Sequence, residues 1–189
     1  MTAVFMPGSK TPIGRLERNF FRGNSRQLVD AAVFRLLAPG RRLLARASAS
    51  VPTSTTDAPV LSPWTSKVVV PNPGDQGEPV LIWPSHVPGL SPFEEFVTSY
   101  AASEYRLLRG VASTKLIQVV RCTQRGDSGA PMYREIRSPT GRPSLALYGL
   151  CSGAVGRFSY FTPVLPMIER LQRAYGKKVY LWVPDANVD

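Results

Sequence analysis

The chain has 189 residues, of which 43% are apolar and 19% charged, enough to bury the core of one mid-sized domain. No stretch approaches the about 18 to 20 uninterrupted apolar residues of a transmembrane helix, and the N-terminal residues lack the features of a signal peptide. One histidine and two cysteines exclude a zinc finger, a multi-histidine metal site and a disulfide-stapled mini-fold. The sequence therefore predicts a fold held by its own hydrophobic core, without a metal or other cofactor.

The net charge of +10 is distributed unevenly: residues 1–47 carry +7, residues 48–100 carry −4 and residues 101–189 carry +7. A basic surface of this kind attracts phosphate or anionic lipid. However, the chain contains no run of five or more basic residues, no recognition-helix motif and no basic stripe interleaved with aromatic residues. Nucleic-acid binding is therefore not expected, although a basic protein that binds nucleic acid or anionic surfaces stays as a competing interpretation.

Eighteen prolines and fifteen glycines interrupt the sequence every few residues, which favours short strands over long helices. Runs of β-branched and aromatic residues predict strands at Ala31–Leu37, Lys67–Val70, Pro79–Trp83, Lys115–Val120, Ser144–Leu150, Phe158–Phe161 and Lys178–Val183. Two further segments, Leu28–Leu37 and Phe93–Leu108, are ambiguous, and the second of them fits a helix as well as a strand. The segment 47–63, rich in Ser, Thr and Pro, is predicted to be an exposed connection.

One helix is predicted at Thr162–Tyr175, where apolar residues recur at spacings of three and four. Thr162 is its expected N-cap, Pro163 suits the first turn, and Gly176 is expected to end it. Many short strands with a single terminal helix predict a mainly antiparallel all-β protein, either a barrel or a sandwich.

The most informative motif lies in residues 121–131, which read RCTQRGDSGAP. Gly126 and Gly129 flank Ser128, so the backbone can turn sharply and its N–H groups can converge on one point. Such a nest suits a developing oxyanion, and a serine held there can act as a nucleophile when a base lies within hydrogen-bond reach. The same residues could also form an ordinary β-turn in which Asp127 bonds its own backbone.

Residues Gly126–Pro131, GDSGAP, resemble the nucleophile motif of chymotrypsin-like serine proteases, Gly-Asp-Ser-Gly-Gly/Ala-Pro. Cys122 stands six residues before the serine, as in the bacterial branch of that family, and the step Ser152-Gly153 follows at a similar interval to the family's Ser-Gly step. Residues 160–164, YFTPV, resemble the strand end before the family's closing helix. Upstream, residues 29–36, VDAAVFRL, resemble its aspartate segment, so the resemblance extends from about residue 25 to the end.

The resemblance implies a trypsin-like double β-barrel. Residues 1–60 would form an incomplete N-terminal barrel and a linker, and residues 61–189 a complete six-stranded C-terminal barrel with a terminal helix. The implied activity is that of a serine-type endopeptidase, which hydrolyses peptide bonds of a peptide or protein substrate through a serine acyl-enzyme.

The resemblance also implies roles for single residues. Ser128 would be the nucleophile and Asp30 would orient the general base, while the N–H groups of Gly126 and Ser128 would form the oxyanion hole. Asp127 would brace the loop. The remaining candidates would line the substrate pocket: Cys122 and Thr123 at its base, and Ser152, Gly153 and Ala154 along one wall. None of these is charged, so a preference for Arg or Lys side chains is not expected.

The sequence departs from the family in its histidine. The family orders its triad His, Asp, Ser, but the 29 residues before Asp30 contain no histidine. The one histidine, His86, follows Asp30 in a proline-rich segment and is expected to be a surface residue rather than the base. We therefore expect an N-terminally truncated or degenerate protease that is weakly active or inactive. The competing interpretation is a catalytically dead homologue that acts as a binding module.

The two cysteines leave two alternatives open. Cys122 and Cys151 could form a disulfide across the pocket walls, or they could remain two buried thiols. The family is often secreted, but the sequence predicts neither a compartment nor an oligomeric state.

Overall fold

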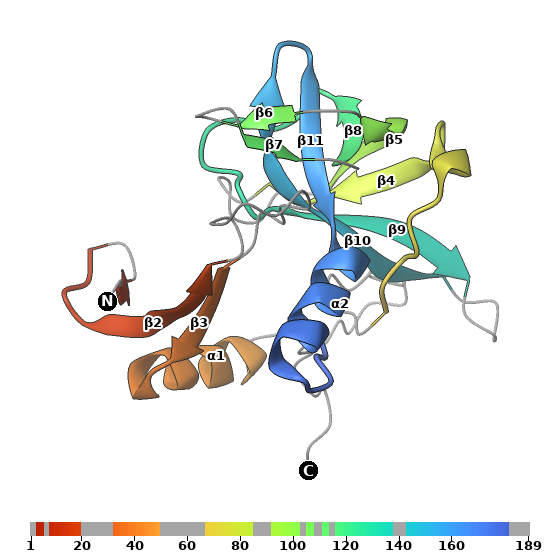
Figure 1. The fold of residues 1–189 in the computed structure, drawn as a ribbon. Coiled ribbons are helices and arrows are strands. Elements are labelled where there is room, and N and C mark those ends of the chain that lie inside the picture. Colours follow the sequence, from red (N-terminus) through yellow and green to blue (C-terminus); the bar gives the residue numbers. More distant parts are fainter. Residues whose placement is uncertain are drawn as a thin grey trace. The chain divides into compact units, whose positions relative to one another are not determined.

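The computed structural model describes residues 3–5, 8–19, 32–49, 67–84, 92–102, 105–107, 111–113, 116–137 and 143–181. These residues fall into two compact units, one formed by the described residues up to 49 and one formed by those from 67 onward (Figure 1). Within the described part, no helix has both the length and the apolar character needed to cross a membrane.

The first unit is a three-stranded antiparallel sheet with one helix. Its strands are β1 (Ala3–Phe5), β2 (Pro12–Asn19) and β3 (Ala32–Leu36), in the order β1-β2-β3, and the helix is α1 (Ala38–Ala49). The strand β3 confirms the prediction for this segment, whereas β1, β2 and α1 were not predicted. Helix α1 lies so close to β2 that a Cβ atom at Gly40 would overlap the carbonyl of Ile13.

The second unit is a closed barrel of six strands, in the order β10-β11-β8-β5-β4-β9. All neighbouring strands of the barrel pair antiparallel. The strands are β4 (Pro79–Ile82), β5 (Phe93–Ala102), β8 (Leu116–Val120), β9 (Pro131–Arg137), β10 (Pro143–Val155) and β11 (Phe158–Pro163). The predicted strands at the positions of β4, β8, β10 and β11 are thus confirmed, and the barrel, rather than a sandwich, is the all-β architecture of this unit.

One open alternative for this unit is decided by the structure, and two predictions need correction. The described residues of the ambiguous segment Phe93–Leu108 are strands rather than a helix: they form β5 between β4 and β8 and then β6 (Tyr105–Leu107), which pairs with β7 (Val111–Ser113). Instead of a strand, Lys67–Val70 makes only an isolated parallel bridge from Val68 to Leu147. The described residues 178–181 likewise form no strand.

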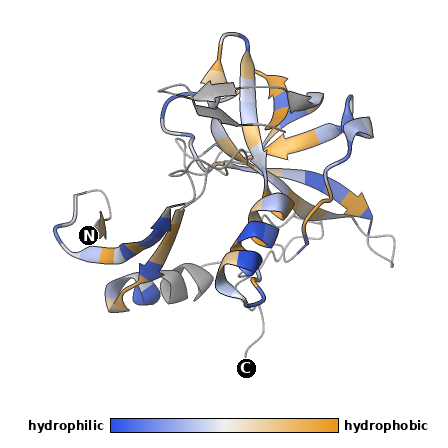
Figure 2. Ribbon diagram, viewed as in Figure 1, coloured by the Kyte–Doolittle hydropathy of each residue, from blue (hydrophilic) through white to orange (hydrophobic). Residues whose placement is uncertain are grey.

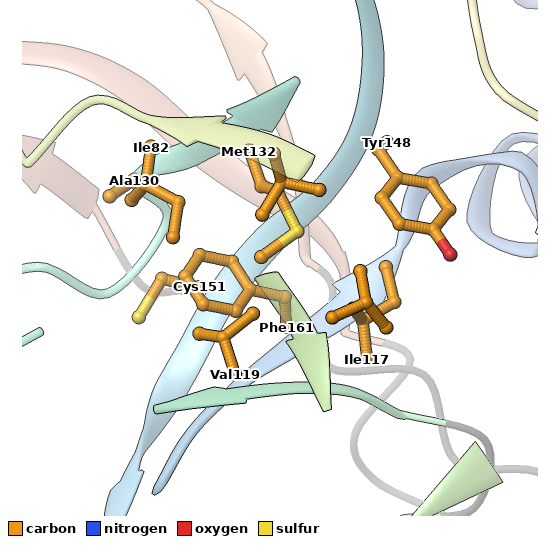
Figure 3. Close-up of a cluster of buried hydrophobic side chains, with 10 residues drawn as sticks. Ile82, Ile117, Val119, Ala130, Met132, Tyr148, Cys151 and Phe161 are labelled. Carbon is orange, nitrogen blue, oxygen red and sulfur yellow. The ribbon is translucent and has the colours of Figure 1, made fainter. Parts of the chain in front are cut away.

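The barrel interior is filled by apolar side chains from its strands (Figure 3). Alternation along the strands sends one set of side chains inward and the other outward, so hydrophobic and hydrophilic positions are interleaved on the strands (Figure 2). The buried cluster consists of Val80, Ile82, Val97, Ile117, Val119, Ala130, Met132, Tyr148, Cys151 and Phe161.

Helix α2 (Val164–Tyr175) follows β11 directly and packs Val164 and Ile168 toward the barrel, while hydrophilic residues occupy its other face (Figure 2). The predicted helix is confirmed, and Gly176 ends it in the left-handed conformation with its N–H bonded to Gln172 O at 2.9 Å. The predicted N-cap is wrong. The cap position is Pro163, and the Thr162 hydroxyl instead lies 2.6 Å from the hydroxyl of Ser152.

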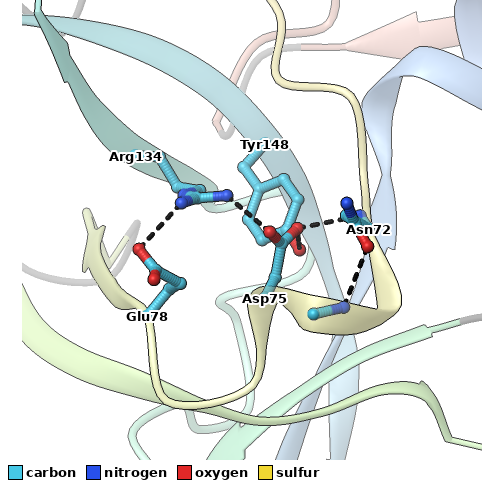
Figure 4. A network of polar contacts seen from close by, with 6 residues as sticks. Asn72, Asp75, Glu78, Arg134 and Tyr148 are labelled. Atoms are coloured by element: carbon cyan, nitrogen blue, oxygen red, sulfur yellow. Dashed lines mark hydrogen bonds and ion pairs between the residues drawn. The ribbon is translucent and has the colours of Figure 1, made fainter.

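A buried polar network fastens the turn before β4 to the barrel (Figure 4). The turn is the 3-10 helix η1 (Pro73–Asp75), which begins with a capping box between Asn72 and Asp75. Asp75 accepts hydrogen bonds from Arg134 Nη1 at 2.8 Å and from Tyr148 Oη at 2.7 Å, so it joins η1 to β9 and β10. Burial and the adjacent Asp75 carboxylate both raise the pKa of Tyr148, so its hydroxyl keeps the proton that it donates.

Candidate functional site

The loop of residues 121–130 connects β8 to β9 and is tied at both ends to the hairpin of β10 and β11. At its start, Arg121 N donates to Arg157 O at 3.0 Å. At its end, Gly129 N donates to Cys151 O at 2.8 Å, and Cys151 N donates to Ala130 O at 2.8 Å. The loop therefore has fixed ends on neighbouring strands of a closed barrel.

The middle of the loop is a turn organised around Asp127, whose side chain is fully buried. Its Oδ2 accepts the N–H of Gln124 at 2.9 Å, and its own N–H donates to Gln124 O at 3.1 Å. Its carbonyl accepts the N–H of Ala130 at 2.8 Å. Asp127 thus binds the backbone on both sides of Ser128 and holds the turn closed.

This pattern leaves particular backbone donors free. In the described part of the chain, every backbone N–H from 121 to 130 donates a hydrogen bond except those of Arg125, Gly126 and Ser128. Gly126 and Gly129 have φ angles of +108° and +88°, which an L side chain rarely adopts, so the turn depends on glycine at both positions. Ser128 itself is exposed between them. Two backbone N–H groups of one turn, those of Gly126 and Ser128, are thus available to donate to an anionic oxygen.

The residues before the turn are held by β11. Thr123 is buried, and the hydroxyl of Ser159 on β11 accepts the N–H groups of Cys122 and Thr123 at 3.1 and 3.2 Å. Neither Cys122 nor Cys151 is part of a disulfide, so the bond between them that the sequence left open is not formed. Cys151 packs inside the barrel core and Cys122 lies against that core, and the two therefore serve as apolar packing groups.

Burial raises the pKa of the Cys122 thiol to about 11, and the Ser159 hydroxyl offsets this only in part. We expect Cys122 to be alkylated by iodoacetamide about 100-fold more slowly at pH 8 than an exposed cysteine in a peptide, because the thiolate is the reactive form. The reaction should accelerate as the pH rises toward 11. Mass spectrometry of the native protein at several pH values measures the rate, and alkylation of Cys122 at the peptide rate at pH 8 would contradict its partly buried position.

The predicted pocket wall lies beside the loop. Ser152, Gly153 and Ala154 follow Cys151 in β10, and Cys151 is the residue that pairs with Gly129 and Ala130. The pairing of β10 with β11 shifts register between Cys151 and Gly153, so a bulge occurs at Ser152, as is common beside functional sites.

The structure thus brings most of the predicted site residues to one region of the barrel, around the 121–130 loop. Asp30 and His86 lie outside the described residues, so the orientation of a base stays a prediction. No described group of three His, Cys, Asp or Glu side chains is arranged to hold a metal ion.

Comparison with known proteins adds no assignment, since no family model and no curated protein matches the sequence.

Two structural residues of this unit were not found by sequence reasoning, although each had a signal. Asp75 follows Asn72 by three residues with Pro73 between them, which is a capping-box pattern. Ser159 alternates in phase with Phe161, so it is a polar residue on the inward face of a strand and needs a hydrogen-bond partner.

Proposed function

We propose that the 121–130 loop is the catalytic loop of a serine-type peptidase of low activity, with Ser128 as its nucleophile. One observation carries the proposal: the exposed Ser128 sits between two left-handed glycines, and the N–H groups of Gly126 and Ser128 have no partner in the described part of the chain. Two such donors would stabilise the oxyanion of a tetrahedral intermediate. The closed antiparallel barrel with its terminal helix is compatible with the C-terminal barrel of the chymotrypsin-like family, which the GDSGAP motif resembles.

In the proposed reaction, Ser128 Oγ forms an ester with the acyl carbon of a peptide bond and gives up its proton. The C–N bond breaks, the amine leaves with a proton, and water then hydrolyses the ester to restore the serine hydroxyl. Asp30 would orient a base, but the sequence places no histidine before it. Without that base the serine proton leaves slowly, and the rate falls by several orders of magnitude.

The substrate side chain would lie against uncharged residues. Cys122 and Thr123 on one side, and Ser152 to Ala154 on the other, offer no carboxylate to bind an Arg or Lys side chain. The proposed substrate is therefore a peptide or protein with a neutral side chain before the cleaved bond.

The proposal is tested with a fluorophosphonate probe on the full chain. We expect slow modification at Ser128, about a thousandfold slower than for an enzyme with a complete triad, and none at that position in Ser128→Ala. Peptide mapping by mass spectrometry locates the adduct. Strong modification of the Ser128→Ala variant at another serine would overturn the assignment. His86→Ala should leave the rate unchanged, and a hundredfold loss would instead make His86 the base.

A binding module is the second candidate function, and one observation favours it. In the described part of the chain, nothing hydrogen-bonds to Ser128 Oγ, so no described group is in place to remove its proton. The same free N–H groups would then bind a carbonyl or carboxylate oxygen of a peptide without cleaving it. Amide shifts of Gly126 and Ser128 on adding a peptide, in the absence of any adduct with the probe, would identify this function.

A further inference from the structure

Ser159 makes an unusual set of contacts for one buried hydroxyl. Its oxygen accepts the N–H groups of Cys122 and Thr123, and it lies 2.8 Å from Thr123 Oγ1. A serine hydroxyl has two lone pairs and one proton. The two N–H groups can occupy these lone pairs, and in the contact with Thr123 Oγ1 either hydroxyl can be the donor. In the described part of the chain, the hydrogen bonds of the Ser159 hydroxyl thus go to Cys122 and Thr123, the two residues that lead into the turn.

These contacts begin where the strand pairing ends. The pairing of β8 with β11 runs to Val120 opposite Phe158, and after the Arg121–Arg157 bond the chain leaves the sheet. The next two N–H groups would have no strand partner, and Ser159 takes both. The N–H after them, that of Gln124, goes to Asp127 Oδ2. Side chains thus replace the strand ladder over three successive residues.

These contacts also restrict the segment that carries the unbonded N–H groups of the loop. Because residues 121–124 are fixed by β11 and Asp127, and residues 129–130 by Cys151, the short segment between them has little freedom. The unbonded N–H groups of Gly126 and Ser128 lie in that segment. Preorganised donors stabilise an anion better than mobile ones, because they need no reorientation when the charge forms.

We propose that Ser159 is a positioning residue for the candidate site: it fixes Cys122 and Thr123 and thereby sets the orientation of the Gly126 and Ser128 donors. The role of Ser159 toward a substrate rests on the proposed function. The effect of Ser159 on the conformation of the loop does not depend on that function. Ser159 touches no reacting atom in this scheme.

The test compares Ser159→Ala with wild type by amide hydrogen exchange and by NMR shifts of the full chain. We expect exchange of the Cys122 and Thr123 amides to accelerate at least about tenfold, because their acceptor is lost while the strands that surround them persist. The amides of Ile117 and Val119 in β8 should change less. The resonances of Gly126 and Ser128 should shift, and probe modification of Ser128 should slow by about tenfold.

Two further variants make the result decisive. Thr98→Val removes a hydroxyl of β5 that donates to Gln118 O at 2.9 Å, and it should change neither loop exchange nor the Ser128 rate. Ser159→Cys keeps a side chain of similar size with a weak acceptor, and serves if the alanine variant does not fold; it should show the same effects in smaller degree.

Uniformly faster exchange across the barrel in Ser159→Ala, or unchanged exchange at Cys122 and Thr123, would overturn the positioning role and leave Ser159 a structural residue. If the probe never modifies wild-type Ser128, the proposed nucleophile fails on its own. Selective exchange and shifted Gly126 and Ser128 resonances would then still support the positioning role.

Discussion

Replacing Asp75 with alanine is expected to lower the free energy of unfolding of the barrel by about 3 kcal/mol, because it removes the more buried of the two carboxylate partners of Arg134 and leaves a buried tyrosine hydroxyl without its acceptor. The Asp75 side chain is only 10% exposed, and that of Arg134 is 20% exposed. The two carboxylate oxygens of Asp75 accept hydrogen bonds from Arg134, Tyr148 and the N–H of Asn72, each at 2.9 Å or less. Urea unfolding followed by circular dichroism measures the loss.

Glu78→Ala is the matched control, because Glu78 binds the same guanidinium at 2.9 Å but its side chain is 49% exposed. We expect a loss of at most about 0.5 kcal/mol, since exposed ion pairs are screened by solvent. Tyr148→Phe should cost about 1 kcal/mol through a single lost hydrogen bond to Asp75. Equal losses for Asp75→Ala and Glu78→Ala would show that burial does not set the strength of this network.

The strands of the barrel could be predicted where local pattern and final environment agree. The segments of β8 and β11 carry β-branched and aromatic residues between turn-forming residues, and both are strands. The segment of β5 was ambiguous because Phe93, Phe96, Val97 and Tyr100 have the spacing of a helix face. Pairing with β4 on one side and with β8 on the other makes this segment a strand. Local periodicity carries no information about such long-range pairing.

Helix α1 is a segment whose local sequence argues against the structure that it forms. Its first residues, Ala38-Pro39-Gly40, suggest a turn, since proline and glycine interrupt regular structure. In the structure Pro39 fits the first turn, and Gly40 is the residue that lets the helix approach the Ile13 carbonyl of β2. That contact joins segments far apart in sequence.

Part of the candidate site could be predicted from the sequence, and part of it could not. The turn around Ser128 could be predicted, because its glycines and Asp127 are local signals and the structure has both left-handed glycines and the bonded carboxylate. The Ser159 contact could not, because Ser159 lies 36 residues from Thr123 and only the closed barrel brings them together. The roles of Ser128 and Asp30 stay predictions.

Replacing Asp127 with alanine is expected to slow modification of Ser128 by the fluorophosphonate probe about 100-fold, since displacement of a reacting group by about 1 Å has that effect. The fully buried carboxylate is the acceptor for Gln124 N–H, and without it the turn loses its internal brace. Near-ultraviolet circular dichroism would show whether the barrel core remains packed in the variant.

Asp127→Asn separates the hydrogen bond from the charge. The amide oxygen can still accept the N–H of Gln124 at the same place in the turn, but the side chain carries no charge. If the brace is the function of Asp127, the asparagine variant should keep modification of Ser128 within about tenfold of wild type, because only the stronger charge-assisted part of the bond is lost. Equal hundredfold losses in both variants would mean that the negative charge itself, and not the closed turn, supports Ser128. Wild-type rates in both would remove Asp127 from the site altogether, because a fully buried carboxylate whose loss leaves the serine unaffected would be holding some other part of the barrel.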